Sequence, residues 1–361
     1  MSAEAELVTS IASHPFRPHD DPTADFVLQT SDNVRFWLCK AVVSRASPVF
    51  NDLFDVPQPS RTSAADGPDE YIDNKPIVRM TEDAAILDVF MRCCYPIARP
   101  EIDPTMLGNL YAIGEKYEAE AVCAYARQEI ARCSLHPKHC LRAYLVAYRF
   151  GLTKEVHAAA KQIIQAHKRE IVLQELPEHH LVPATAITRL EGYRSRCLRA
   201  VGMLCTPQGC LRLTWNDRPP MWFWGSPELD YQPLDPRCTC RLNSDIYNGG
   251  HVKGHPSDDD HDVCEGGTQY KMKLWFTRYL WDIRSLIEKG DVPIRQALLD
   301  SEALGHAVEN ASSECDICGK DVAQALVELL KDIEAEIDKC VAKVPFEESD
   351  PQQKQPNVAM I

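Results

Sequence analysis

The sequence predicts an α+β fold, in which a small sheet flanked by helices is followed by a mostly α-helical C-terminal region. Apolar and polar residues alternate between residues 26 and 38, the period of half-buried strands. Later segments place apolar residues three or four positions apart, the period of amphipathic helices. The chain of 361 residues is 45% hydrophobic and 25% charged, an ordinary globular composition, and its length suffices for two or three domains.

Two strands and two helices open the predicted sheet domain. Residues 26–28 and 34–38 alternate in polarity, and the Ser31-Asp32-Asn33 cluster between them favours a turn, so a hairpin is expected. The helix that follows should end near Ala46. Ser47-Pro48 breaks it and begins the next helix, because serine caps helices and proline suits the first helical position.

Three further helices should pack against this sheet. Each carries apolar side chains along one face, which predicts that this face is buried. The apolar residues of the three helices are Ile86, Val89, Phe90, Cys93 and Cys94; then Met106, Leu110, Ile113 and Tyr117; and finally Val122, Ala126 and Ile130.

The order of these elements resembles that of the BTB/POZ domain of the fungal type, an interaction fold. Its landmarks occur in family order across residues 20–133: Ser47-Pro48-Val49-Phe50, Ile77-Val78-Arg79-Met80, Thr81-Glu82-Asp83, Tyr95-Pro96, Glu115-Lys116-Tyr117 and Val122. Cys39 stands where the family usually has histidine, and we expect a tolerated change in the core. The helical residues 134–200 are similar to a shortened BACK extension, the helical region that follows many BTB domains.

This resemblance implies a protein–protein interaction module, or adapter, that is not an enzyme. Family roles are bridging a substrate to a cullin ubiquitin ligase and oligomerising a transcriptional regulator, so the expected partners are proteins, including a cullin scaffold or a second copy of the chain. The sequence contains no P-loop, dinucleotide fingerprint, nucleophile elbow or His-Glu-x-x-His pair. The alternative is a zinc- or thiol-dependent enzyme carried by the Cys/His-rich C-terminal region.

Charge and hydropathy exclude other partners. The formal charge of −14 without a basic block disfavours nucleic acid, and no apolar run approaches the roughly 20 residues that span a bilayer. The N-terminus lacks the pattern of a signal peptide, so we expect an intracellular protein, cytoplasmic or nuclear. Among the 15 cysteines, Cys93, Cys94, Cys123 and Cys140 are interpreted as small buried residues with free thiols, which indicates a reducing compartment.

Composition also predicts the domain boundaries. Proline, glycine and serine are frequent after Val56, where no apolar spacing continues, and regular periodicity is lost again after Cys205. The expected segments are a flexible tail at 1–19, the BTB/POZ-like domain at 20–133 with a mobile loop at 57–75, the BACK-like extension at 134–200, an irregular and helical region at 201–346, and a flexible tail at 347–361.

Two close cysteine pairs predict a structural zinc site in the C-terminal region. Cys315 and Cys318 have the spacing that lets two thiolates reach one tetrahedral ion, and Gly319 is expected to permit a tight turn after them. Cys238 and Cys240 would supply the other two ligands. Helices are expected between and after the pairs: one ending at Gly290, one at 298–308 and one at 321–341.

Other ligand sets remain open at this point. His251, His255, His261 and Cys264 offer substitute ligands, although the surrounding glycines and aspartates are typical of a solvated loop. His179 and His180 are adjacent, so their side chains point in different directions and do not chelate an ion by themselves. The simplest alternative is that the four cysteines are free thiols in a loop.

Overall fold

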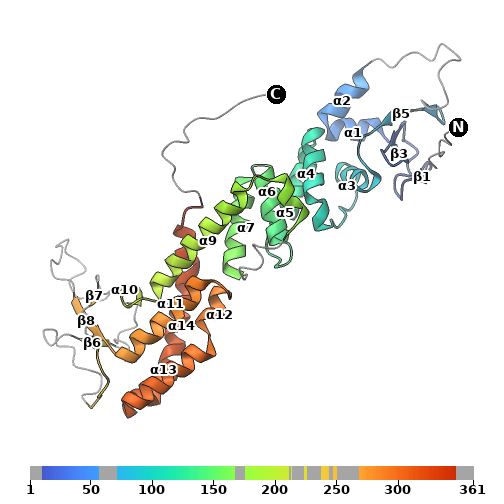
Figure 1. The fold of residues 1–361 in the computed structure, drawn as a ribbon. Coiled ribbons are helices and arrows are strands. Elements are labelled where there is room, and N and C mark those ends of the chain that lie inside the picture. Colours follow the sequence, from blue (N-terminus) through green and yellow to red (C-terminus); the bar gives the residue numbers. More distant parts are fainter. Residues whose placement is uncertain are drawn as a thin grey trace, which may run out of the picture. The chain divides into compact units, whose positions relative to one another are not determined.

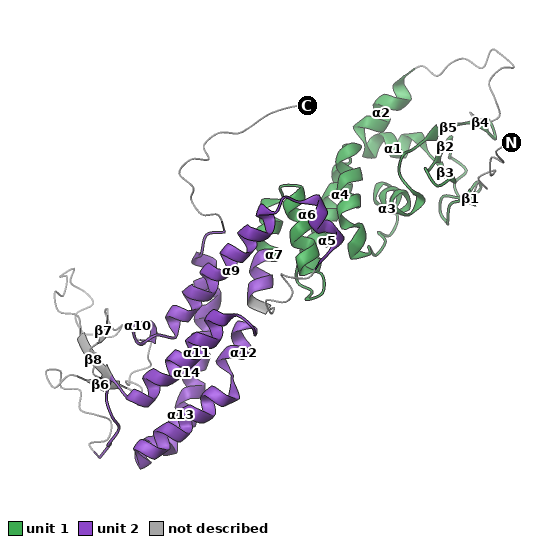
Figure 2. Ribbon diagram, in the orientation of Figure 1, with its two compact units in different colours: residues 1–159 green, residues 160–361 purple. Residues whose placement is uncertain are grey.

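The computed structural model describes residues 10–56, 71–166, 175–210, 213, 223–225, 237–243, 247–249 and 268–346 (Figure 1). The chain forms two compact units, Met1–Ala159 and Ala160–Ile361, which Figure 2 shows in different colours. Helix α7 (Thr153–Ala166) contains the boundary between them. The structure therefore divides the chain at 159, whereas the finer boundaries at 133 and 200 stay predictions.

The first unit is built on a five-stranded sheet of order β1-β3-β2-β5-β4. Its strands are β1 (Ser10–Ile11), β2 (Phe26–Gln29), β3 (Val34–Leu38), β4 (Tyr71–Ile72) and β5 (Lys75–Arg79). The predicted hairpin is confirmed, because β2 and β3 pair antiparallel with Phe26 opposite Leu38. Strand β5 pairs parallel with β2, and β1 parallel with β3.

Helices α1 (Lys40–Ala46) and α2 (Pro48–Asp55) meet at Ser47, where the sequence predicts the break. The Ser47 hydroxyl accepts a hydrogen bond from the Phe50 backbone at 3.2 Å, which caps α2, and donates one to the Tyr117 carbonyl. Phe50 also stacks on the Tyr117 ring, with 4.9 Å between ring centroids. Ser47 thus connects the start of α2 to Tyr117, a residue 70 positions further along the chain.

The remaining helices of the first unit form its core with the sheet. They are α3 (Ala84–Cys94), the 3-10 helix η1 (Pro104–Met106), α4 (Leu107–Lys116), α5 (Glu120–Ser134) and α6 (Cys140–Arg149). Helix α3 packs on α4 and α5, which also pack on each other, and α6 packs on α5. The predicted stripe on α5 is confirmed, since Val122, Ala126 and Ile130 are fully buried.

The bounds expected for the N-terminal tail at 1–19 and for the loop at 57–75 both need correction. Residues 10–16 belong to the fold and not to a tail, because β1 pairs with β3 and the Phe16 side chain is only 1% exposed. In the predicted loop, residues 71–74 form β4 and the turn into β5, and Lys75 is the first residue of β5, while 57–70 lie outside the described residues.

The cysteines of the first unit are less uniformly buried than expected. Cys93 and Cys140 are buried, whereas Cys94 and Cys123 are only partly buried. Cys39 is also partly buried, at the N-cap of α1, where its backbone N–H donates to the Tyr95 hydroxyl at 2.7 Å. It is therefore a position at the edge of the core.

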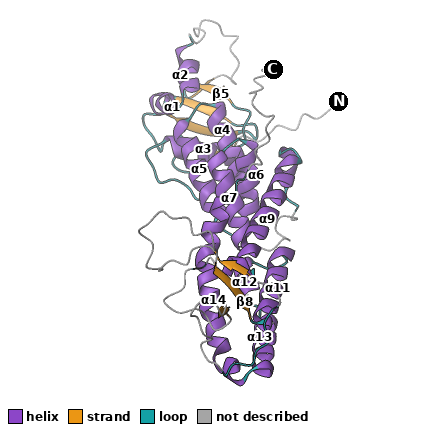
Figure 3. Cartoon of the chain, turned by 90° about the vertical axis from the view of Figure 1, so that its left-hand side faces the viewer, coloured by secondary structure: helices purple, strands orange, loops and turns teal. Residues whose placement is uncertain are grey.

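The second unit consists mainly of helices (Figure 3). They are η2 (Pro177–Leu181), α9 (Thr185–Leu204), α10 (Pro207–Cys210), α11 (Leu274–Lys289), α12 (Ile294–Leu298), α13 (Ser301–Glu314) and α14 (Asp316–Lys343). Helices α9 and α13 each pack against α11 and α14. Gly290 ends α11 as predicted, with a left-handed φ of 67° that favours glycine.

Three features of this unit differ from expectation. Strands β6 (Phe223–Gly225), β8 (Thr268–Met272) and β7 (Tyr247–Gly249) form an antiparallel sheet in that order, in a region expected to be irregular and helical. Helix α13 begins at Ser301 rather than at 298, because Asp300 caps it. The last helix begins at Asp316 rather than at Asp321, so Cys318 lies in its first turn and Cys315 is its N-cap residue.

The fold class is mixed α+β, with one small five-stranded sheet and predominantly helical structure after it. Within the described ranges, no helix combines the length and the apolar character needed to cross a bilayer.

Candidate metal centre

The N-terminus of α14 presents Cys315 and Cys318. Cys315 is the N-cap residue, with extended φ and ψ of −162° and 117°, and Cys318 lies in the first helical turn. The Gly319 backbone N–H donates to the Cys315 carbonyl at 2.9 Å, which closes that turn. Both sulfurs therefore lie near the positive end of the helix dipole, which favours thiolates.

Cys238 and Cys240 lie on a short segment held by backbone and side-chain hydrogen bonds. The Thr239 hydroxyl donates to the Glu314 carbonyl at 2.9 Å, which ties the segment to the end of α13. The Leu274 N–H donates to the Arg241 carbonyl at 2.8 Å, which ties it to the start of α11. Because α14 begins directly after α13, these contacts bring the two cysteine pairs together.

The four sulfur atoms form one cluster, with every pair within 4.8 Å. The Cys238–Cys318, Cys240–Cys318 and Cys238–Cys315 sulfur pairs are separated by 3.6, 3.4 and 3.7 Å. Zinc–sulfur bonds of about 2.3 Å in a tetrahedron place sulfurs about 3.8 Å apart. The four cysteines could therefore hold a metal ion with small adjustments.

Burial and charge act differently on the individual thiols. Burial alone would raise the pKa of Cys315, but the backbone N–H groups of Cys318 and Thr239 outweigh it and lower the pKa to about 6. Burial raises the pKa of the Cys240 and Cys318 thiols. A cation would displace their protons, because cysteine binds metal as the thiolate.

Gly319 has a different role from the one its sequence position suggests. It lies inside α14, so no tight turn depends on it. A Cβ atom at Gly319 would lie 2.8 Å from both Cα and Oγ of Ser312, closer than side chains tolerate. The glycine therefore permits close packing of α14 on α13 beside the cysteines.

Lys273 belongs to the site, although no sequence pattern indicates it. Its Nζ atom lies 2.8 Å from the Cys318 sulfur, and the residue is only 5% exposed. It precedes Cys318 by 45 residues and follows a strand, so neither spacing nor helical periodicity relates it to the cysteines.

Of the other sequence candidates, His179 makes a local backbone contact. The His179 ring contacts the backbone of Leu176, with Nδ1 accepting from its N–H at 2.9 Å. His251, His255, His261 and Cys264 lie outside the described residues. In the part of the chain that the structure describes, the four cysteines are the one group with metal-ligand geometry.

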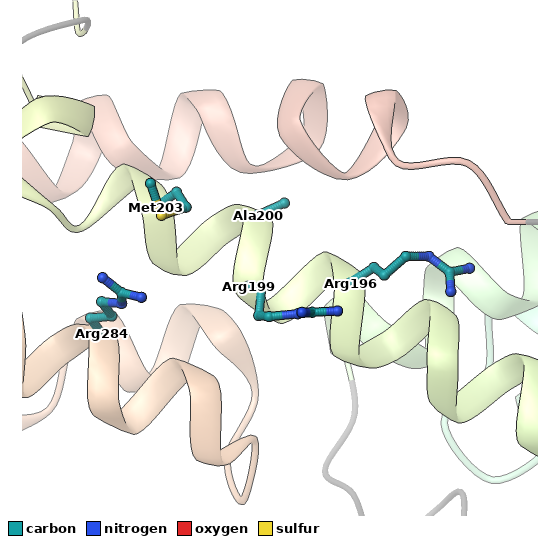
Figure 4. Close-up of a pocket in the computed structure, with 5 residues that line it drawn as sticks. All are labelled: Arg196, Arg199, Ala200, Met203 and Arg284. Atoms are coloured by element: carbon teal, nitrogen blue, oxygen red, sulfur yellow. The ribbon is translucent and has the colours of Figure 1, made fainter. Parts of the chain in front are cut away.

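A surface pocket of about 360 Å³ in the second unit is lined by Arg196, Arg199, Ala200, Met203 and Arg284 (Figure 4). In Figure 4 the Arg199 guanidinium points along α9 away from Arg284. Arg284 Nε donates to Glu288 at 2.7 Å, and an Arg196 N–H donates to the Phe346 carbonyl at 2.9 Å. The three cations do not converge on a common point, so the pocket does not define an anion site.

Comparison with known proteins identifies no relative of this chain among family models or curated proteins. The function is therefore argued from the residues and contacts described above.

Proposed function

We propose that this protein is an adapter for protein–protein interaction, built on a BTB/POZ-like first unit. The observation that carries the proposal is the order and pairing of its elements. The β2–β3 hairpin leads into α1 and α2, β5 then pairs parallel with β2, and α3 to α5 pack together after it. This order agrees with the order of the sequence landmarks.

Contacts between separate landmarks support the proposal. Ser47 and Phe50 belong to one landmark and Tyr117 to another, and they are joined by a hydrogen bond and by ring stacking. Glu82, from a third landmark, accepts a hydrogen bond from the Tyr117 hydroxyl at 3.0 Å. Residues from three separate landmarks of the family resemblance therefore contact one another directly.

The end of α2 offers a contact surface for a protein partner. Leu53 and Val56 are three positions apart and are 38% and 58% exposed. Exposed apolar side chains are individually ordinary, but adjacent ones provide area that a partner can bury. We propose this surface for a protein partner such as a cullin scaffold, a transcriptional regulator or a second copy of the chain.

Affinity purification of the tagged full chain, with mass spectrometry and reconstitution from purified components, tests the adapter proposal. A cullin, a transcriptional regulator or self-association would each identify one adapter role. Val56→Asp should weaken the reconstituted complex, whereas Leu135→Asp, at a residue 65% exposed beyond α5, should not. Absence of any stoichiometric complex would contradict the proposal.

For the second unit, we propose that the four cysteines bind a structural zinc ion. Four thiolates complete a tetrahedral shell and leave no open position for substrate or water, which favours a structural role over a hydrolytic one. Zinc would join the Cys238–Cys240 segment to α14. Turnover that is lost on substituting one cysteine in a folded chain would instead support the thiol- or zinc-dependent enzyme.

Metal analysis of protein purified without a metal-binding tag tests the zinc proposal. We expect about one zinc per chain, and Cys318→Ser should lower both zinc content and protease resistance of the second unit. Cys340→Ser is the matched control, because Cys340 is partly buried on the same helix but distant in sequence from the cluster. Less than about 0.1 zinc per chain in reduced, folded protein would reject the site, given the affinity of four thiolates.

The oxidation state of the cysteines relates to the cellular compartment, because disulfides persist mainly in oxidising compartments. All 14 cysteines among the described residues are unpaired by disulfides. Together with the proposed zinc, this supports a protein of the cytoplasm or nucleus.

A further inference from the structure

A buried lysine faces the cysteine cluster. The Lys273 side chain is 5% exposed, and its Nζ atom lies 2.8 Å from the Cys318 sulfur. Lysine is almost never fully buried unless it is paired. Among the described residues, Lys273 has no carboxylate partner, and the groups that act on its ammonium are the sulfurs of Cys318 and Cys238, so these sulfurs compensate its burial.

The backbone fixes Lys273 beside the segment that carries the first cysteine pair. Lys273 and Leu242 form an antiparallel bridge. On either side of it, Asn243 N–H donates to the Met272 carbonyl, and Leu274 N–H donates to the Arg241 carbonyl, each at 2.8 Å. The lysine therefore holds its place through backbone contacts that do not depend on a metal ion.

The charge of the cluster explains what this placement achieves. Four thiolates around a divalent ion leave a net charge of about −2 in a mostly buried site, which is costly without compensation. An ammonium group has donors and no acceptor, so Lys273 can only donate to the sulfur. Such donation withdraws electron density from the thiolate and weakens it as a nucleophile.

We propose that Lys273 is the built-in counter-charge of the four-cysteine metal site, which tightens metal retention and protects Cys318 from electrophiles. This inference rests on the proposed zinc site and adds a residue that acts through a ligand without binding the ion. It is a positioning residue in the second coordination shell, where substitutions commonly change metal affinity by about 10- to 100-fold.

The test uses the full chain with Lys273→Met, which keeps an apolar stem of similar length and removes the charge. Zinc affinity is measured by competition with a chromogenic chelator, and the alkylation rate of each cysteine is measured by mass spectrometry. We expect zinc binding about 10- to 100-fold weaker and faster alkylation of Cys318, while alkylation of Cys340, which lies outside the cluster, stays unchanged. Lys289→Met, at the exposed last residue of α11, the helix that Lys273 precedes as its N-cap, should change neither quantity.

Three results would overturn the inference or part of its basis. A folded Lys273→Met chain with unchanged zinc affinity and unchanged Cys318 alkylation rejects the role of the lysine alone. A wild-type chain without zinc rejects the metal site and this inference together. If Lys273→Met does not fold, Lys273→Gln, which keeps a donor without the charge, should show the same weakening, and unchanged binding there rejects the inference.

Discussion

Gly319 illustrates how a single hydrogen atom in place of a side chain sets the position of the metal ligands. Gly319→Ala would place a methyl group 2.8 Å from the Ser312 backbone and force α14 away from α13. We expect a loss of at least about 1 kcal/mol in the stability of the second unit, together with lower zinc content. Thermal unfolding and metal analysis of the purified variant measure both.

Gly305 supplies the matched control on α13. A Cβ there would meet no atom within 4 Å, so alanine adds helix propensity without a clash. Gly305→Ala should therefore stabilise the protein by about 0.5–1 kcal/mol and leave zinc content unchanged. Equal behaviour of the two variants would show that the close packing at Gly319 is unimportant.

Phe36 on β3 tests the core of the first unit. Its side chain is 1% exposed, so Phe36→Asp removes buried apolar area and introduces a charge without a partner. We expect a loss of at least about 3 kcal/mol, seen as a lower unfolding temperature. Leu135→Asp, at an exposed position, should be nearly neutral. Unchanged unfolding of Phe36→Asp would show that the side chain does not face the core.

Glu82 makes the stability of the first unit depend on pH. Burial alone would raise the pKa of Glu82, but hydrogen bonds from Lys116 and Tyr117 outweigh it and hold the pKa below its usual value of 4.5. A pKa depressed by folding means that the carboxylate stabilises the fold above that usual value, and this stability is lost as pH falls through the lower, folded value.

Replacing Glu82 by glutamine should remove this contribution to the pH dependence of stability. Glu82→Gln should be less stable than the wild type at pH 7, and the difference should shrink below about pH 4. Unfolding temperatures across this range provide the measurement, with the exposed Glu120→Gln as control. A difference that stays constant with pH would show that the carboxylate charge is not involved.

At the scale of elements, the sequence predicted those whose signals are local. Ser47-Pro48 marks the junction of α1 and α2, and Gly290 marks the end of α11, because capping depends on residues within one turn. The alternation at 26–38 predicted the β2–β3 hairpin for the same reason. The two cysteine pairs were identifiable because ligand spacing within each pair is also local.

Other elements depend on distant partners and were missed. Strand β1 has two residues and exists because β3 offers a free edge, so nothing in its own sequence marks it. The sheet of β6, β8 and β7 joins segments that are far apart in the chain. Lys273 was missed for the same physical reason, since its partner at Cys318 lies 45 residues further on.

At the scale of the molecule, metal removal should act on one unit and leave the other intact. All four cysteines belong to the second unit, and structural zinc contributes apparent binding energies on the order of 10 kcal/mol or more. A strong chelator should accelerate amide hydrogen exchange in α11 and α14, while exchange in β2 and β3 stays unchanged. Cys318→Ser should reproduce this pattern, and the chelator should then have no further effect. Equal acceleration in both units would contradict their independence.

The separation of the ligands also bears on synthesis. Cys238 precedes Cys318 by 80 residues. At about 5–20 residues per second, the ribosome needs roughly 4–16 seconds to pass from the first ligand to the last. During that interval the nascent chain carries an incomplete set of thiolates, while the first unit has already been synthesised. The centre can therefore close only after Cys318 has been synthesised, and the packing of the helices between the two cysteine pairs is complete only once α14 is present.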